Sequence, residues 1–171
     1  MLQVITGGSG SGKSAYAEDC ILKLGCGERI YIATMYPFDE ESYRRIARHR
    51  AMRREKSFDT IECYTGLKDV NIPQGANVLL ECMSNLTANE IYLENGAGDT
   101  TIEVILQGID TLLHQAANLI VVTNEIFSDG IDYDEETKRY QRYLGRINLE
   151  LAKQAEYVTE VVYGIPVTIK G

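Results

Sequence analysis

The first candidate for chemistry is a glycine-rich segment that ends in a lysine and a serine. Gly7-Gly8-Ser9-Gly10-Ser11-Gly12-Lys13-Ser14 fits the pattern G-x-x-x-x-G-K-S/T in full and lies between an expected strand and an expected helix. Its glycines allow backbone N–H groups to approach phosphate oxygens closely. We expect Lys13 to contact the β- and γ-phosphates and the Ser14 hydroxyl to bind Mg²⁺. The alternative is a Gly- and Ser-rich turn that binds no ligand.

Polar residues that directly follow apolar runs are the next candidates. Glu81 follows the run Asn77–Leu80, where a phosphate-binding protein needs an acid for its Mg²⁺ shell. A surface glutamate at a strand end is the alternative. Asn124 and Glu125 follow a second run, and they would bind nucleotide, metal or acceptor. The alternative is a helix cap or a polar pair in a loop. Thr34 follows a third run and is a further candidate donor to a ligand.

An arginine-rich segment supplies positive charge in an otherwise acidic chain. Like charges three and four residues apart repel on a helix, so a bound anion would reduce this electrostatic repulsion. Guanidinium groups such as those of Arg50 and Arg53 suit bidentate contacts to phosphate oxygens. A neutral imidazole at His49 would act as a nucleophile on phosphorus. The alternative is a solvated basic face that is paired with nearby acids. The basic side chains are Arg44, Arg45, Arg48, Arg50, Arg53, Arg54 and Lys56.

The overall composition restricts the class of protein. The chain has 171 residues, 44% hydrophobic and 25% charged, which fits one globular domain over residues 1–171. Its net charge of −8 argues against a general nucleic-acid binder. No apolar run approaches the roughly 20 residues that span a bilayer, and the first residues resemble a strand and not a signal peptide. With only two histidines, and cysteines that lack C-x-x-C spacing, we expect reduced thiols and no multi-histidine metal site.

Apolar runs alternate with helical patterns along the chain, which predicts an α/β fold. We expect a mostly parallel sheet with helices on both faces and a C-terminal β-hairpin. Ligands in such folds bind at the carboxyl ends of the strands. The expected strands are Leu2–Thr6, Arg29–Ala33, Phe58–Glu62, Asn77–Leu80, Leu119–Thr123, Tyr157–Val162 and Pro166–Ile169, and the expected helices are Ser14–Lys23, Asp39–Arg54, Ser84–Glu94, Thr101–Ala117 and Asp134–Ala155.

The order of these segments resembles one family, the bifunctional adenosylcobinamide kinase/adenosylcobinamide-phosphate guanylyltransferases of cobalamin biosynthesis. The resemblance covers nearly the whole chain. The phosphate loop alone is not specific, but its combination with an Arg-His-Arg segment, a Thr-Asn-Glu strand end and a Gly-Ile-Pro hairpin is. The segments that carry the resemblance are Val4–Ser14, Tyr31–Thr34, Arg45–Arg50, Thr60–Glu62, Leu79–Cys82, Val122–Glu125 and Gly145–Asn148.

The resemblance implies a RecA-like P-loop NTPase fold and a homo-oligomer, namely a trimer. It implies that the protein phosphorylates adenosylcobinamide with ATP or GTP. It further implies transfer of GMP from GTP to adenosylcobinamide phosphate through a guanylylated histidine, which maps onto His49. Mg²⁺ would accompany the nucleotide at Ser14 and Glu81. The family's other nucleotide contacts map onto Ala33, Thr34, Met35, Glu62 and Glu81.

Two other functions fit the same residues. A plain P-loop small-molecule kinase would not need His49 and would form no covalent adduct. A non-enzymatic nucleotide-sensing module would bind nucleotide without turnover and would present Arg44–Arg54 to a partner. Ser14 and Glu81 favour an enzyme, although switch proteins also use such residues for Mg²⁺. We expect a cytoplasmic enzyme that binds neither nucleic acid nor membrane.

Overall fold

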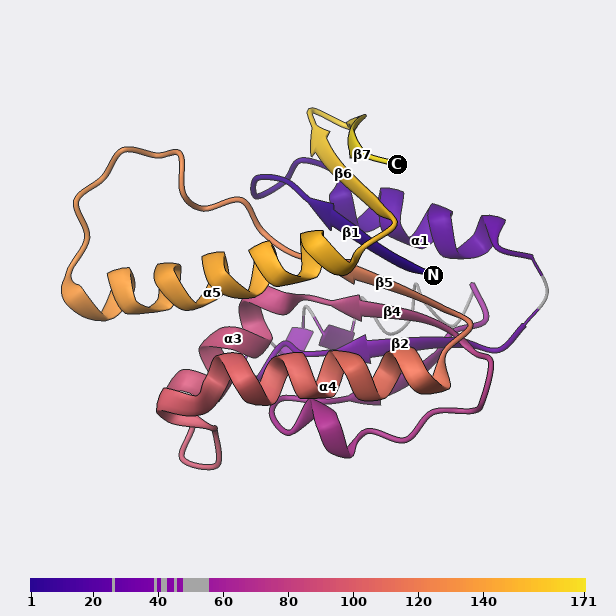
Figure 1. Cartoon of the computed structure of the whole chain (residues 1–171), viewed down its shortest axis with the longest axis horizontal. Coiled ribbons are helices and arrows are strands. Elements are labelled where there is room, and N and C mark those ends of the chain that lie inside the picture. Colours follow the sequence, from indigo (N-terminus) through magenta and orange to yellow (C-terminus); the bar gives the residue numbers. More distant parts are fainter. Residues whose placement is uncertain (26, 39, 41–42, 45, 48–55) are drawn as a thin grey trace.

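The computed structural model describes the chain except residues 26, 39, 41–42, 45 and 48–55. The described residues form a seven-stranded sheet in the order β3-β2-β4-β5-β1-β6-β7 (Figure 1). Every neighbouring pair is parallel except β6 and β7, which form an antiparallel hairpin. The strands are β1 (Leu2–Thr6), β2 (Arg29–Ala33), β3 (Asp59–Glu62), β4 (Asn77–Glu81), β5 (Asn118–Val122), β6 (Tyr157–Val162) and β7 (Ile165–Lys170).

Helices cover both faces of the sheet, as the sequence predicts. Helix α1 packs on one face, and α3, α4 and α5 pack on the other (Figure 1). Because neighbouring residues of a strand point to opposite faces, Ile5 and Leu79 pack with α1, whereas Val4 and Leu80 pack with the other three helices. The helices are α1 (Lys13–Lys23), α3 (Met83–Tyr92), α4 (Thr101–Gln115) and α5 (Glu135–Gln154), with 3-10 turns η1 (Leu67–Asp69) and η2 (Gly98–Thr100).

Most predicted elements are confirmed, with shifts of one or two residues at their ends. The aromatic ring of Phe58 lies outside β3 and packs edge-on against Tyr31, with ring centroids 6.1 Å apart. Its apolar character therefore reflects packing and not strand pairing. Helix α4 ends at Gln115 because the backbone of Ala116 is extended. Within the expected helix Asp39–Arg54, the described residues 40, 43–44 and 46–47 are helical, and the others lie outside the described residues.

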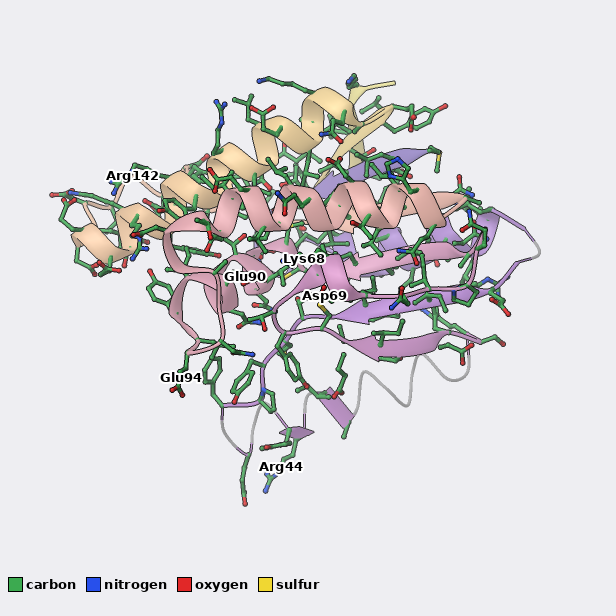
Figure 2. The ribbon with its side chains drawn as sticks, turned by 60° about the horizontal axis from the view of Figure 1, so that its bottom comes forward. Arg44, Lys68, Asp69, Glu90, Glu94 and Arg142 are labelled. Atoms are coloured by element: carbon green, nitrogen blue, oxygen red, sulfur yellow. The ribbon has the colours of Figure 1, made fainter. Side chains whose placement is uncertain are left out.

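A buried carboxylate joins α3 to two neighbouring loops. Glu90 is 1% exposed and accepts hydrogen bonds from the backbone N–H groups of Gly66, at 2.7 Å, and Ala97, at 2.9 Å. Figure 2 shows Glu90 near Lys68 and Asp69 beneath α4, and the three residues line one hollow. Glu90 thus fixes the loops that follow β3 and α3.

None of the described helices is long and apolar enough to cross a membrane.

Candidate nucleotide-binding site

The phosphate loop connects β1 to α1 and requires glycine at two positions for different reasons. A side chain at Gly7 would place its Cβ 2.5 Å from the carbonyl oxygen of Val161 on β6. Gly12 directly precedes the first residue of α1. Its φ of 91° is a left-handed conformation that residues other than glycine rarely adopt. The loop therefore runs close against β6 and turns sharply into the helix. Its backbone N–H groups and the N-terminal end of α1 together suit an anion.

Lys13 is held inside the loop. The residue is 8% exposed, and Nζ donates a 3.0 Å hydrogen bond to the carbonyl oxygen of Gly8. Burial lowers the pKa of Lys13 because it disfavours the charged form, while the neighbouring Cys82 and Glu81 act in the opposite direction. A phosphate group in the loop would favour the protonated ammonium group.

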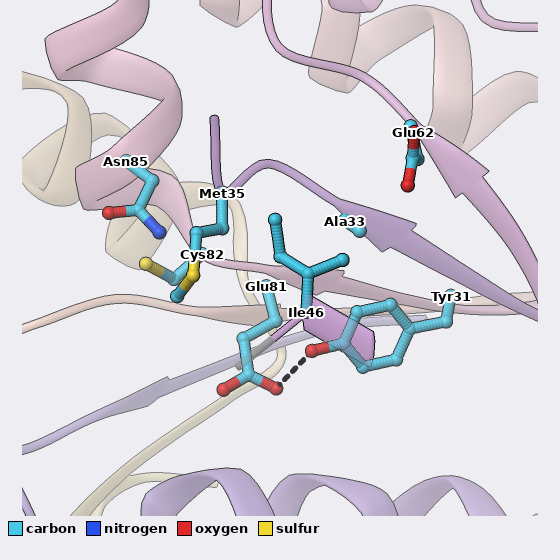
Figure 3. Close-up of a pocket in the computed structure, with 8 residues that line it drawn as sticks. All are labelled: Tyr31, Ala33, Met35, Ile46, Glu62, Glu81, Cys82 and Asn85. Carbon is cyan, nitrogen blue, oxygen red and sulfur yellow. Dashed lines mark hydrogen bonds between the residues drawn. The ribbon is translucent and has the colours of Figure 1, made fainter. Parts of the chain in front are cut away.

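The two predicted magnesium ligands lie together. The Ser14 hydroxyl donates a hydrogen bond to Oε1 of Glu81. Figure 3 shows the second hydrogen bond, in which the Tyr31 hydroxyl donates to Oε2 at 2.8 Å. Hydroxyl and carboxylate oxygens are ligands that Mg²⁺ accepts, and Mg²⁺ usually keeps waters and phosphate oxygens in addition. Among the described residues no group of three or more His, Cys, Asp and Glu side chains could hold a metal alone. The hydroxyl of Ser14 and the carboxylate of Glu81 fit Mg²⁺ that arrives with a nucleotide.

A pocket of about 90 Å³ opens beside Glu81 and contains several of the predicted contacts. Figure 3 shows Glu62 at one end, on β3, and Met35 with Asn85 at the other. The lining is mostly apolar, with carboxylates at Glu62 and Glu81, a composition that suits an organic ring with a few polar groups. The residues that line it are Tyr31, Ala33, Met35, Ile46, Glu62, Glu81, Cys82 and Asn85.

Thr34 holds the backbone of Cys82, a residue that lines this pocket. It is fully buried, and its hydroxyl accepts from the backbone N–H of Cys82 at 2.7 Å and donates to the carbonyl oxygen of Cys82 at 2.8 Å. Its own carbonyl oxygen accepts from Asn89 at 2.8 Å. Thr34 thus joins the ends of β2 and β4. A direct contact of Thr34 with a ligand stays a prediction.

The two candidates after β5 have different surroundings. Asn124 donates to the Ser84 hydroxyl at 2.7 Å, and that hydroxyl lies 3.1 Å from the buried thiol of Cys82. Asn124 is therefore linked through Ser84 to Cys82, which lines the pocket. Glu125 bonds through its backbone N–H to the carbonyl oxygen of Gly7, while its carboxylate accepts from Phe127 and Ser128. That carboxylate closes a turn within the loop after β5 and caps no described helix.

Sequence reasoning missed three residues of this region. Tyr31 orients Glu81, and its polar hydroxyl within an apolar strand was the available signal. Asn85 and Ile46 line the pocket without a motif that marks them. The predicted residues His49, Arg50 and Arg53 lie outside the described residues.

The fold and the loop together define a RecA-like P-loop nucleotide-binding protein. Among solved structures, an ATPase domain matches with a TM-score of 0.52 at 9% identity, over 93% of this chain and 68% of that chain. Residues 3–169 match the family described as cobinamide kinase / cobinamide phosphate guanyltransferase. The chain belongs to this family.

Two curated relatives extend over the full length of the chain. The bifunctional adenosylcobalamin biosynthesis protein CobU of Escherichia coli is 30% identical, over 99% of this chain and 100% of the relative. The bifunctional adenosylcobalamin biosynthesis protein CobP of Pseudomonas aeruginosa is 31% identical, over 100% of this chain and 98% of the relative.

Proposed function

We propose that this chain is an adenosylcobinamide kinase and adenosylcobinamide-phosphate guanylyltransferase. It phosphorylates adenosylcobinamide with ATP or GTP and then transfers GMP from GTP to the phosphorylated product. The observation that carries the proposal is the meeting of Ser14 and Glu81 beside the buried Lys13, in a chain whose whole length matches this family. These are the groups that phosphoryl transfer requires.

In the kinase step, the acceptor hydroxyl oxygen attacks the γ-phosphorus and gives up its proton to solvent. The bond from that phosphorus to the bridging oxygen breaks and releases the nucleoside diphosphate. Lys13 and the N–H groups of the loop stabilise the negative charge that develops. Ser14 and Glu81 would hold Mg²⁺, which would neutralise charge on the phosphates. Tyr31 keeps the Glu81 carboxylate oriented for this role.

In the guanylyl step, a ring nitrogen of His49 attacks the α-phosphorus of GTP and pyrophosphate leaves. A phosphate oxygen of the acceptor then attacks the same phosphorus, and the bond to His49 breaks. Arg50 and Arg53 contact the nucleotide phosphates, while Ala33, Met35, Glu62 and Glu81 line the nucleoside pocket. Support for His49 comes from the family resemblance, and support for the two arginines comes from the fit of guanidinium groups to phosphate oxygens. Ile46, three residues before His49, lines the same pocket.

We extend the proposal to the assembly and the compartment. The chain forms one catalytic domain and assembles as a homo-oligomer, with a trimer as the expected form. The exposed edge strand β7 supports an interface, because Ile165 and Ile169 are 65% and 61% exposed there. The free thiols of Cys20, Cys63 and Cys82 fit the cytoplasm, where thiols remain reduced.

The decisive experiment is intact-protein mass spectrometry after incubation with Mg²⁺, GTP and pyrophosphatase. We expect a GMP-sized increment on the wild type and none on His49→Ala. His114→Ala is the matched control, because His114 is the other histidine and lies exposed on α4. No increment on the wild type would leave the plain kinase, and the formation of ADP or GDP with adenosylcobinamide would then identify it. Nucleotide binding without either activity would indicate the sensing module.

A further inference from the structure

A second hollow adjoins the nucleotide pocket and has aromatic walls. It has a volume of about 300 Å³ and shares Met35 and Asn85 with the nucleotide pocket. A molecule bound in it would therefore lie next to the pocket that contains Glu81. We call it the aromatic groove; its lining residues are Met35, Tyr36, Phe38, Asn85, Ala88, Asn89, Tyr92 and Leu93.

Three aromatic rings of this groove are exposed to solvent. Phe38 is 74% exposed, Tyr92 is 52% exposed and Tyr36 is 36% exposed. Tyr36 contacts Phe38 with ring centroids 5.0 Å apart and Tyr64 with centroids 5.2 Å apart. Such a group of rings presents a broad apolar surface to solvent, and surfaces of this kind mark binding sites. A flat ligand with an apolar face would remove that surface from water.

Two features give the groove a fixed shape and a polar group. The hydroxyl of Tyr92 donates to the carbonyl oxygen of Glu136 at 3.0 Å, which anchors this ring to α5. Asn89 donates to Thr34, so α3 is tied to the end of β2. The side-chain amide of Asn85 forms no hydrogen bond with any described residue. It stands at the junction of the groove and the nucleotide pocket, beside Met35 and Cys82 (Figure 3).

We propose that the aromatic groove binds the corrin ring of the acceptor, with its hydroxyl arm directed toward Glu81. This inference rests on the proposed function. A corrinoid is a broad macrocycle with apolar faces and a rim of amide groups. The exposed rings of Tyr36, Phe38 and Tyr92 fit such a face, and the Asn85 amide fits the rim. The shared wall allows one bound acceptor to meet the γ-phosphate in one step and the guanylyl group in the next.

A kinetic test separates acceptor binding from nucleotide binding. In Phe38→Ala, the exposed ring is removed at little cost to folding. We expect the KM for adenosylcobinamide and for its phosphate to rise about tenfold, since burying a phenyl group contributes that much to affinity, while adduct formation from GTP alone is retained. Tyr157→Ala is the control, because Tyr157 is 47% exposed at the opposite end of the sheet. It should leave both measurements at the wild-type value.

Two outcomes of this test would overturn the proposal. An unchanged acceptor KM in Phe38→Ala would show that the ring does not contact the acceptor. Loss of adduct formation from GTP alone in the same variant would show that the groove holds a nucleotide base. Where the wild type itself forms no adduct, the guanylyl half of the proposed function fails, and the acceptor KM of the kinase step still tests the groove.

A binding test needs no catalysis. The chain contains no tryptophan, so Phe38→Trp creates a single fluorescent reporter in the groove, and Tyr157→Trp creates a matched one outside it. Corrinoids absorb light strongly and quench tryptophan emission at close range. We expect cobinamide to quench Phe38→Trp with a saturating curve that GTP does not compete away. Equal, non-saturating quenching of both variants would overturn the proposal, even where turnover is absent.

Discussion

The hydroxyl group of Tyr31 donates a 2.8 Å hydrogen bond to Oε2 of Glu81, and the hydroxyl of Ser14 donates to the other oxygen of the same carboxylate. Strands β2 and β4 are neighbours in register, with Ala33 opposite Glu81, so the Tyr31 side chain reaches the carboxylate from the adjacent strand. The carboxylate is thus oriented by one hydroxyl on each oxygen. These two hydrogen bonds hold it beside the phosphate loop.

Replacement of Glu81 should impair both half-reactions together. In Glu81→Gln the volume is kept but the negative charge for Mg²⁺ is lost, and we expect kcat to fall about a hundredfold with a higher Mg²⁺ requirement. Tyr31→Phe, which removes only the orienting hydrogen bond, should cost about tenfold or less. Initial rates over a Mg²⁺ titration measure both effects. A loss in Tyr31→Phe as large as in Glu81→Gln would contradict this division of roles.

Nucleotide affinity should fall at alkaline pH through Lys13. Burial lowers the pKa of this lysine, and phosphates bind its protonated form. As the pH rises through the lowered pKa, the free protein loses the ammonium charge, so binding must take up a proton and weakens by up to about tenfold per pH unit. Titration calorimetry with GTP in the absence of Mg²⁺, from neutral pH upward, measures the decline. Lys13→Arg keeps its charge and should show none; an identical decline there would assign it to another group.

The strongest features of the site could be predicted because they are local in the sequence. The phosphate loop and Glu81 are identified by residues within a few positions of an apolar strand, and the structure brings Ser14 and Glu81 together. The contact of the loop with the C-terminal hairpin was not predictable. Gly164 donates to the carbonyl oxygen of Ser11 at 2.8 Å, and only the pairing of β1 with β6 brings these distant residues together.

Side-chain direction limits sequence reasoning in the same way. The apolar runs predict the strands and the two-sided sheet, and the alternation in the core confirms them. Whether Thr34 faces a ligand or the neighbouring strand depends on the register of β2 against β4, which the pattern of residues does not specify. The Tyr31 hydroxyl depends on the same register. The end of α4 differs from the expected one for a similar reason. The backbone of Ala116 is extended because the chain there leads into β5.

Loss of the buried carboxylate of Glu90 should destabilise the fold. Glu90→Ala leaves the N–H groups of Gly66 and Ala97 without their acceptor, and we expect the free energy of unfolding to fall by about 3 kcal/mol. Glu90→Gln keeps one acceptor oxygen and should lose about half of that. Urea unfolding with a common slope gives these values. Glu94 provides the control, because it is a glutamate near Glu90 in the sequence but is exposed (Figure 2). Glu94→Ala should change the free energy of unfolding by less than about 0.5 kcal/mol.

The thiol of Cys63 should be inert in the folded protein. Burial raises its pKa to about 12, and the nearby carboxylates of Glu90 and Asp69 act in the same direction. Because the thiolate is the form that alkylates, at pH 8 only roughly one Cys63 thiol in ten thousand would be ionised, against about a quarter of ordinary thiols. We expect iodoacetamide to label Cys63 about a thousandfold more slowly in the native protein than in urea. Peptide mass spectrometry measures this against the half-buried Cys20 in the same digest, and equal rates for Cys63 in both states would contradict the prediction.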